Sequence, residues 1–168
     1  MEYLLLFFEY FILKGLKHFF FKLIVLLAIV YCIYHLINDC IFEKNVKDFY
    51  NNNITILGIL IGFTVSVFTI FMTIDNKNIR DAKLKKIGRI IFTKEITLYD
   101  SLVMNLAFLI VIQGFSLIAN FIYPLLIPLE TDIGKIAFSI NITFTINIIM
   151  ILMRSILDFY FILSKKEN

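Results

Sequence analysis

The sequence predicts an all-α integral membrane protein with four transmembrane helices, and three observations support that fold class. Apolar residues make up 60% of the 168 residues, charged residues only 17%, and the mean hydropathy is +0.89. Soluble domains are about 45–50% apolar and about 25% charged, so the excess apolar surface requires a bilayer as its solvent. Four apolar runs approach the ~20 residues that a membrane-spanning helix needs. The basic residues, finally, are spread unevenly over the segments between these runs.

The four predicted spans cover residues 19–37, 54–74, 102–122 and 136–153. In the first span, Lys22 is close enough to the end for its ammonium group to reach the headgroups. The second span carries no charged residue. We expect Pro124 and Pro128 to end the third span, and Arg154 to close the fourth.

Two segments allow more than one interpretation. Within the fourth span, residues 138–148 alternate apolar and polar side chains, as a strand does. A membrane barrel needs at least about eight such strands, which this chain cannot supply, so we favour a helix. Residues 1–16 either extend the first span or lie flat at the inner interface as an amphipathic helix, and we favour the interfacial position.

The distribution of lysine and arginine predicts the topology. Thirteen of the sixteen basic residues lie in the N-terminal segment, the second loop (residues 75–101) and the C-terminal tail. The other two loops hold only Lys44, Lys47 and Lys135. Because loops rich in lysine and arginine stay in the cytoplasm, we expect both termini and the second loop to be cytoplasmic.

The second span contains a stripe of small residues at intervals of four: Gly58, Gly62 and Ser66. Such a stripe lets two helix backbones approach closely in a membrane. The partner helix could belong to a second copy of the chain, which would make the stripe an oligomer interface or line a pore. It could equally be another helix of the same chain.

Two polar stripes occupy the third and fourth spans: Asn105, Gln113, Ser116 and Asn120 on the third, and Ser139, Thr143 and Asn147 on the fourth. At about 100° per residue, each set falls on one helix face. The stripes form either a hydrated path or hydrogen-bonded contacts inside a bundle. Asn141 and Thr145 are expected to point the other way, and this second polar face favours contacts in an oligomer.

The second loop concentrates seven of the sixteen basic residues. Its apolar residues Ile79, Leu84, Ile87, Ile90 and Ile91 can share one broad helical face, which predicts a basic amphipathic helix. We expect a patch that binds anionic lipid or a cytoplasmic protein, formed by Lys83, Lys85, Lys86 and Arg89. Alternatively, these charges serve topology alone. Charge by itself also permits nucleic-acid binding, but no recognition motif supports it.

The sequence offers no catalytic or metal site. Cys32, His35 and Cys40 do not match a metal-ligand spacing, and no hydrolase triad, zinc-protease motif or phosphate-binding loop occurs. No carboxylate lies in the middle of a span, which argues against a coupled transporter. We therefore expect a protein without cofactors that is not an enzyme.

The four spans, the compact second loop and the run GILIGFTVSVFTIF at residues 58–71 together carry a family resemblance. The chain resembles the small four-span membrane proteins of bacterial anti-phage systems, and most closely the membrane subunit of the Kiwa type. The resemblance is architectural and covers the whole chain. It implies a homo-oligomeric sensor in the bacterial inner membrane that works with a soluble cytoplasmic partner.

Three functions follow as hypotheses. The first is a membrane sensor or scaffold that oligomerises and controls a cytoplasmic partner, and it is the one we favour. The second is an oligomeric pore that depolarises the membrane, as an abortive-infection effector or a holin-like protein does. The third, an integral membrane enzyme, has the least support because no catalytic set is present.

Overall fold

The computed structural model describes residues 16–37, 39–91, 94–126 and 131–164. Four long helices dominate this part of the chain: α2 (Leu16–Leu36), α3 (Asp39–Thr73), α5 (Leu98–Leu126) and α6 (Asp132–Leu163). A short helix and a two-stranded antiparallel hairpin lie between α3 and α5: α4 (Lys77–Leu84), β1 (Lys86–Ile91) and β2 (Lys94–Thr97). We call α4 and the hairpin together the cap.

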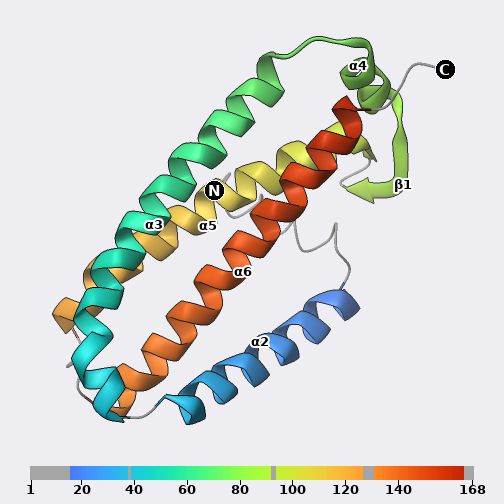
Figure 1. Cartoon of the computed structure of the whole chain (residues 1–168). Coiled ribbons are helices and arrows are strands. Elements are labelled where there is room, and N and C mark those ends of the chain that lie inside the picture. Colours follow the sequence, from blue (N-terminus) through green and yellow to red (C-terminus); the bar gives the residue numbers. More distant parts are fainter. Residues whose placement is uncertain (1–15, 38, 92–93, 127–130, 165–168) are drawn as a thin grey trace.

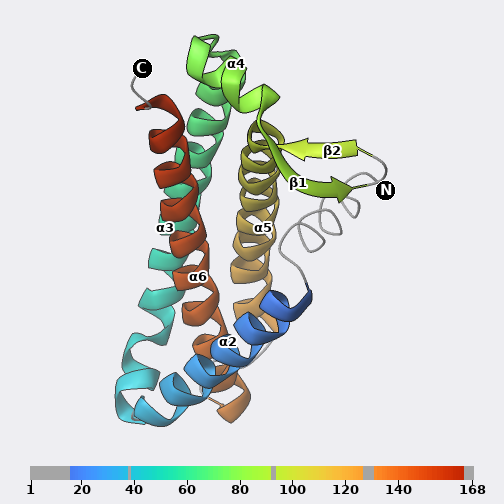
Figure 2. The same ribbon diagram turned by 90° about the vertical axis from the view of Figure 1, so that its right-hand side faces the viewer.

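Helices α3, α5 and α6 run side by side as an elongated bundle, with the cap at one end (Figure 1). Helix α2 lies at the other end, against the N-terminal half of α6 (Figure 2). Three segments are long and apolar enough to cross a membrane: Asn45–Thr73, Leu98–Leu126 and Asp132–Leu163. The apolar part of α2 whose side chains are described, Leu23–Leu36, is shorter. Three of the predicted spans thus lie in helices that are able to cross a membrane, and the fourth stays a prediction.

The surface of the bundle is apolar around most of its circumference. Large hydrophobic side chains are exposed on every long helix, for example Leu27 on α2, Ile59 on α3, Phe121 on α5 and Met150 on α6. Soluble monomers rarely expose contiguous apolar patches beyond a few hundred Å². This pattern therefore indicates insertion into a membrane, in agreement with the composition.

Helix α3 begins fifteen residues before the predicted span, at Asp39. The segment that we expected to be an outer loop is therefore largely helical. Phe42, Val46 and Tyr50 recur at intervals of four, and all three are buried together with Phe138 of α6. This small aromatic core explains why the helix continues beyond its uncharged part, because the same face remains in contact with α6.

Two helices extend beyond the residues at which we expected the spans to end. Helix α5 includes Pro124 and ends at Leu126. Proline has no amide hydrogen to donate, but at this position the helix loses one hydrogen bond in its last turn rather than in its middle, so the helix tolerates it. Helix α6 passes Arg154 and continues to Leu163, because Ser155 and Ile162 are still buried there. The choice of helix over strand for residues 136–153 is confirmed.

The predicted amphipathic helix of the second loop is correct only for α4. Asn76 caps this helix, its side chain accepting a hydrogen bond from the Ile79 amide at 2.8 Å, and Ile79 and Ala82 are buried. Beyond Lys85 the chain forms the hairpin, whose pairing is irregular between Lys86 and Ile90. Gly88 lies in this irregular stretch with a φ of 68°, a conformation that glycine adopts without strain.

The junction between the hairpin and α5 is a reciprocal cap. The Asp100 carboxylate accepts hydrogen bonds from the Thr97 amide and hydroxyl at 3.1 and 2.8 Å, and the Asp100 amide donates to the Thr97 hydroxyl at 3.1 Å. Such a capping box satisfies amide donors that the first turn of a helix otherwise leaves free. It fixes where α5 begins and therefore how the hairpin is attached to the bundle.

Candidate functional site

The centre of the bundle contains a cluster of carboxamides contributed by three different helices. Asn53 of α3 donates through its side-chain nitrogen to the oxygens of Asn120 on α5 and Asn141 on α6, at 3.1 and 2.8 Å. Asn141 donates to the Asn120 oxygen at 2.7 Å. The Thr145 hydroxyl donates to the Asn53 oxygen at 3.1 Å. We call these four residues the amide cluster.

Every carboxamide oxygen in the amide cluster accepts at least one hydrogen bond. The Asn120 nitrogen additionally donates to the Ser116 carbonyl of its own helix at 2.7 Å. Asn53 and Asn120 are only 2% and 1% exposed, so these bonds replace water for groups that would be costly to leave unpaired in an apolar interior. The arrangement therefore joins α3, α5 and α6.

A second polar contact lies nearer to the cap. The Gln113 nitrogen on α5 donates to the Thr64 hydroxyl on α3 at 3.1 Å, and both residues are fully buried. The Thr64 hydroxyl in turn donates to the Leu60 carbonyl at 2.7 Å. This contact pairs α5 with α3, and it does not reach the polar stripe of α6.

Among the described residues, the side-chain hydrogen bonds of the third-span stripe do not reach the predicted stripe of the fourth span. Ser139 and Thr143 are buried, but their hydroxyls donate to Lys135 and Ser139 carbonyls within α6. Asn147 is half-buried, and Asn105 lies near the cap, away from the amide cluster.

The expectation that Asn141 and Thr145 point away from α5 is wrong, because both belong to the amide cluster. The sequence analysis also missed Asn53 and Thr64. Asn53 stands in a run of three asparagines before the predicted second span, a position that we had assigned to a loop. Asn53 is a polar residue at helical spacing between the apolar residues Tyr50 and Leu57, and this pattern could have identified it.

The small-residue stripe of α3 faces outward. Gly58, Gly62 and Ser66 are all exposed, and a Cβ atom built on either glycine meets no other atom within 4 Å. Ser66 donates to the Gly62 carbonyl at 2.8 Å, so its hydroxyl is satisfied within α3. The alternative in which the stripe packs against another helix of the same chain is therefore wrong for the part of the chain that the structure describes.

The predicted basic patch lies on the cap. Lys83, Lys85 and Lys86 are exposed; Lys86 forms an ion pair with Glu95, and the Lys83 ammonium lies 4.8 Å from the centre of the Tyr99 ring. Arg89 belongs to β1, and its side chain lies outside the described residues. The three lysines come from the end of α4 and the start of β1.

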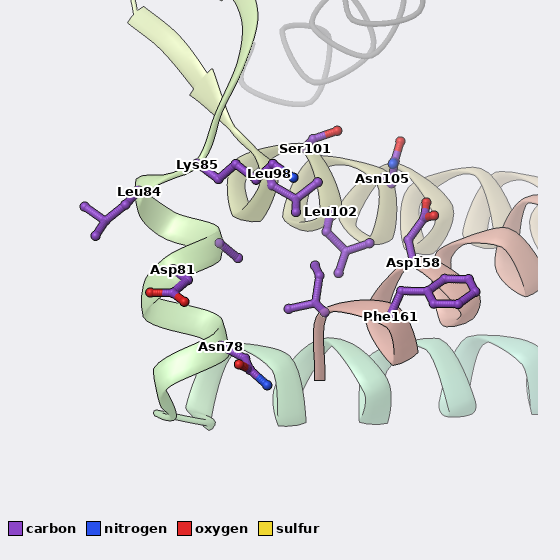
Figure 3. Close-up of a pocket in the computed structure, with 12 residues that line it drawn as sticks. Asn78, Asp81, Leu84, Lys85, Leu98, Ser101, Leu102, Asn105, Asp158 and Phe161 are labelled. Carbon is purple, nitrogen blue, oxygen red and sulfur yellow. The ribbon is translucent and has the colours of Figure 1, made fainter. Parts of the chain in front are cut away.

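A cavity of about 640 Å³ separates the cap from the bundle (Figure 3). Helix α4 forms one wall, the first two turns of α5 the second, and the end of α6 the third. Its polar lining consists of Asn78, Asp81, Lys85, Ser101, Asn105 and Asp158. Leu98, Leu102, Phe161 and Ile162 contribute most of the apolar lining. Its size falls within the range of about 300–1,000 Å³ typical of small-molecule sites.

A second, smaller cavity of about 410 Å³ opens between α5 and α6 beside the amide cluster. Its walls are mostly apolar, including Phe115, Ile140 and Phe144, and Ser116 and Asn120 lie at its polar side. Among the described residues, no three histidine, cysteine, aspartate or glutamate side chains are grouped closely enough to bind a metal ion.

Comparison of the chain with models of known protein families, with curated proteins and with solved structures gives no match. The class of the protein therefore rests on its own helices: a helical bundle with three segments able to cross a membrane and a small cap at one end. The resemblance to the Kiwa-type membrane subunit stays a prediction.

Proposed function

We propose that this chain is a non-enzymatic sensor or scaffold of the bacterial inner membrane that oligomerises and controls a soluble cytoplasmic partner in anti-phage defence. In this proposal α2 provides the fourth crossing, both termini and the cap lie in the cytoplasm, and the cap receives the partner. The composition, the distribution of basic residues and the family resemblance support it.

The single observation that favours this function is that the carboxamides of the bundle bond to one another, whereas lysines of the cap are exposed. Inside the bundle, the carboxamides of Asn53, Asn120 and Asn141 bond to one another and join the helices. On the cap, by contrast, Lys83 and Lys85 are exposed. A surface with free positive charges attracts an acidic protein surface over a Debye length of about 8 Å at physiological salt.

A charge-neutralised variant tests this function. Lys83→Gln, Lys85→Gln, Lys86→Gln and Arg89→Gln are combined, and the chain is purified in mild detergent from cells that also express the genes next to it. We expect the variant to insert and assemble normally but to recover at least about tenfold less partner, the effect of losing ~1.4 kcal/mol of binding free energy.

The matched control is Lys47→Gln with Lys135→Gln, which removes positive charge at the opposite end of the molecule. This control should recover the partner at the level of the unmodified chain. Equal partner recovery with the quadruple variant and the unmodified chain would mean that the basic patch serves topology alone, and the proposal would fail.

An oligomeric pore is the second candidate function, and one observation favours it. The exposed face of α3 carries hydroxyls at Thr55, Ser66, Thr69 and Thr73 beside the two glycines. Each hydroxyl donates to a carbonyl within α3, so this face is polar yet satisfied. Several copies that turned these faces toward a common axis would line a channel. Release of an encapsulated dye from liposomes containing the purified chain would support the pore over the scaffold.

A further inference from the structure

The larger cavity lies where the apolar part of the bundle ends. Its α5 wall extends from Leu98 to Asn105, around the start of the predicted span 102–122. Its α6 wall, Asp158 to Ile162, lies beyond Arg154. In a bundle that crosses the bilayer, this level is occupied by lipid headgroups rather than by acyl chains.

The cavity combines opposite charges with an apolar surface. Asp81 of α4 and Asp158 of α6 supply two carboxylates, and Lys85 supplies an ammonium group. Within the described ranges the ion pairs join Arg80 to Asp75 and Lys86 to Glu95, so these three groups have no partner of that kind. Figure 3 shows Lys85 extending toward Leu98, and Asp158 across the cavity from α4.

The cavity lining also contains uncharged polar side chains that can form hydrogen bonds. Ser101 and Asn105 lie along the α5 wall and offer hydroxyl and carboxamide oxygens, and Asp158 extends from the α6 wall toward α5 (Figure 3). Leu102 and Ile162 add an apolar part to the lining. Asn78 closes another side, where its side chain donates to the Leu163 carbonyl at the end of α6 at 2.9 Å.

We propose that this cavity binds the headgroup of a phospholipid that carries a primary ammonium group, that is, a lipid of the phosphatidylethanolamine class. The ammonium group would donate charge-assisted hydrogen bonds to the Asp158 carboxylate and to the oxygens of Asn105 or Ser101. The phosphate would lie near the Lys85 ammonium, and the glycerol and upper acyl chain would contact Leu102 and Phe161.

Two other common headgroups fit less well. A choline headgroup is trimethylated and has no N–H to donate to the carboxylates. A glycerol headgroup leaves the lipid with a net negative charge beside Asp81 and Asp158, which repel it. The cavity should therefore select ethanolamine over choline and over glycerol, and this preference depends on membrane insertion but not on the cytoplasmic partner.

Native mass spectrometry of the full chain in mild detergent tests the preference. The protein is titrated separately with phosphatidylethanolamine, phosphatidylcholine and phosphatidylglycerol that have identical acyl chains, and the association constant of the first bound lipid is measured. We expect phosphatidylethanolamine to bind about fivefold more tightly than either other lipid, the size of effect that one partly exposed charge-assisted hydrogen bond produces.

Asp158→Asn should reduce this preference to less than about twofold, because the carboxamide keeps the shape but loses the charge. Asp48→Asn, an exposed carboxylate at the other end of the molecule, is the matched control and should leave the preference unchanged. Ser101→Trp, which places an indole in the cavity, should weaken the first binding event for all three lipids.

The proposal is overturned if the unmodified chain binds the three lipids equally or prefers phosphatidylglycerol. It is also overturned if Asp158→Asn keeps the full preference, or if Ser101→Trp, verified as folded by its unfolding temperature, binds lipid normally. The lipid titration contains no partner protein and leaves Lys85 unchanged, so its failure is distinguishable from a failure of partner recovery, with which it shares only Lys85.

Discussion

At the scale of single residues, Asn120 is the centre of the amide cluster. Its oxygen accepts from both Asn53 and Asn141, and its nitrogen donates to the Ser116 carbonyl. Interhelical hydrogen bonds in membrane proteins contribute on average only about 0.6 kcal/mol each. Removing the Asn120 side chain costs more than one bond, because the half-buried Asn141 nitrogen loses its acceptor and the Asn53 nitrogen keeps only its bond to Asn141.

We expect Asn120→Ala to destabilise the bundle by about 1–3 kcal/mol. The measurement is the unfolding temperature of the purified chain in mild detergent. Asn51→Ala, an exposed asparagine on the same helix as Asn53, is the control and should leave the unfolding temperature within error. An unchanged unfolding temperature for Asn120→Ala would show that the amide cluster does not hold the helices together.

At the scale of elements, α3 has two different faces. One face is buried and carries Asn53, Leu57 and Thr64 toward α5 and α6. The other face carries Gly58, Gly62 and Ser66 and has no contact within the described part of the chain. Close approach of a second helix to this face is the physical reason to expect an oligomer.

Gly62→Leu should therefore block helix approach and reduce the mass of the particle measured by mass photometry in mild detergent. Gly114→Leu is the control, because Gly114 of α5 also has free space around its Cβ position but belongs to no small-residue stripe. A wild-type chain that is monomeric would refute the oligomer itself. Normal assembly of the Gly62→Leu variant would refute only the role of the stripe.

At the scale of the whole molecule, the arrangement places the cap and the start of α6 at opposite ends of the bundle (Figure 1). Because α3, α5 and α6 are long and apolar enough to cross a membrane, we expect these two ends to lie on opposite sides of it. The basic residues concentrated around the cap predict that this end is cytoplasmic.

A cysteine at position 86, introduced by Lys86→Cys after Cys32 and Cys40 are replaced by serine, should not react with a membrane-impermeant maleimide in intact cells. It should react once the cells are permeabilised. Asp48→Cys, near the opposite end, should be labelled in intact cells because its side chain is exposed there. Labelling of position 86 from outside would reverse the topology and place the cap beyond the reach of any cytoplasmic partner.

Whether a segment is an apolar helix depends on a sum over about twenty neighbouring residues. The sequence alone therefore determined the apolar middle of each long helix and the membrane environment that the helix surfaces indicate, but not where the helices begin and end. It also identified Asn120 and Gln113 as polar groups that require partners, because an unpaired carboxamide in an apolar surrounding is costly wherever it lies.

Only the tertiary structure decided which groups meet. Asn141 and Thr145 join Asn53 because helix rotation and axial shift, which no local pattern fixes, turn them inward. The helical start of α3 depends on burial against Phe138, and the hairpin on a glycine with positive φ. The cavity lined by both Asp81 and Asp158 arises because residues 77 positions apart in the chain border the same space, and packing alone creates this proximity.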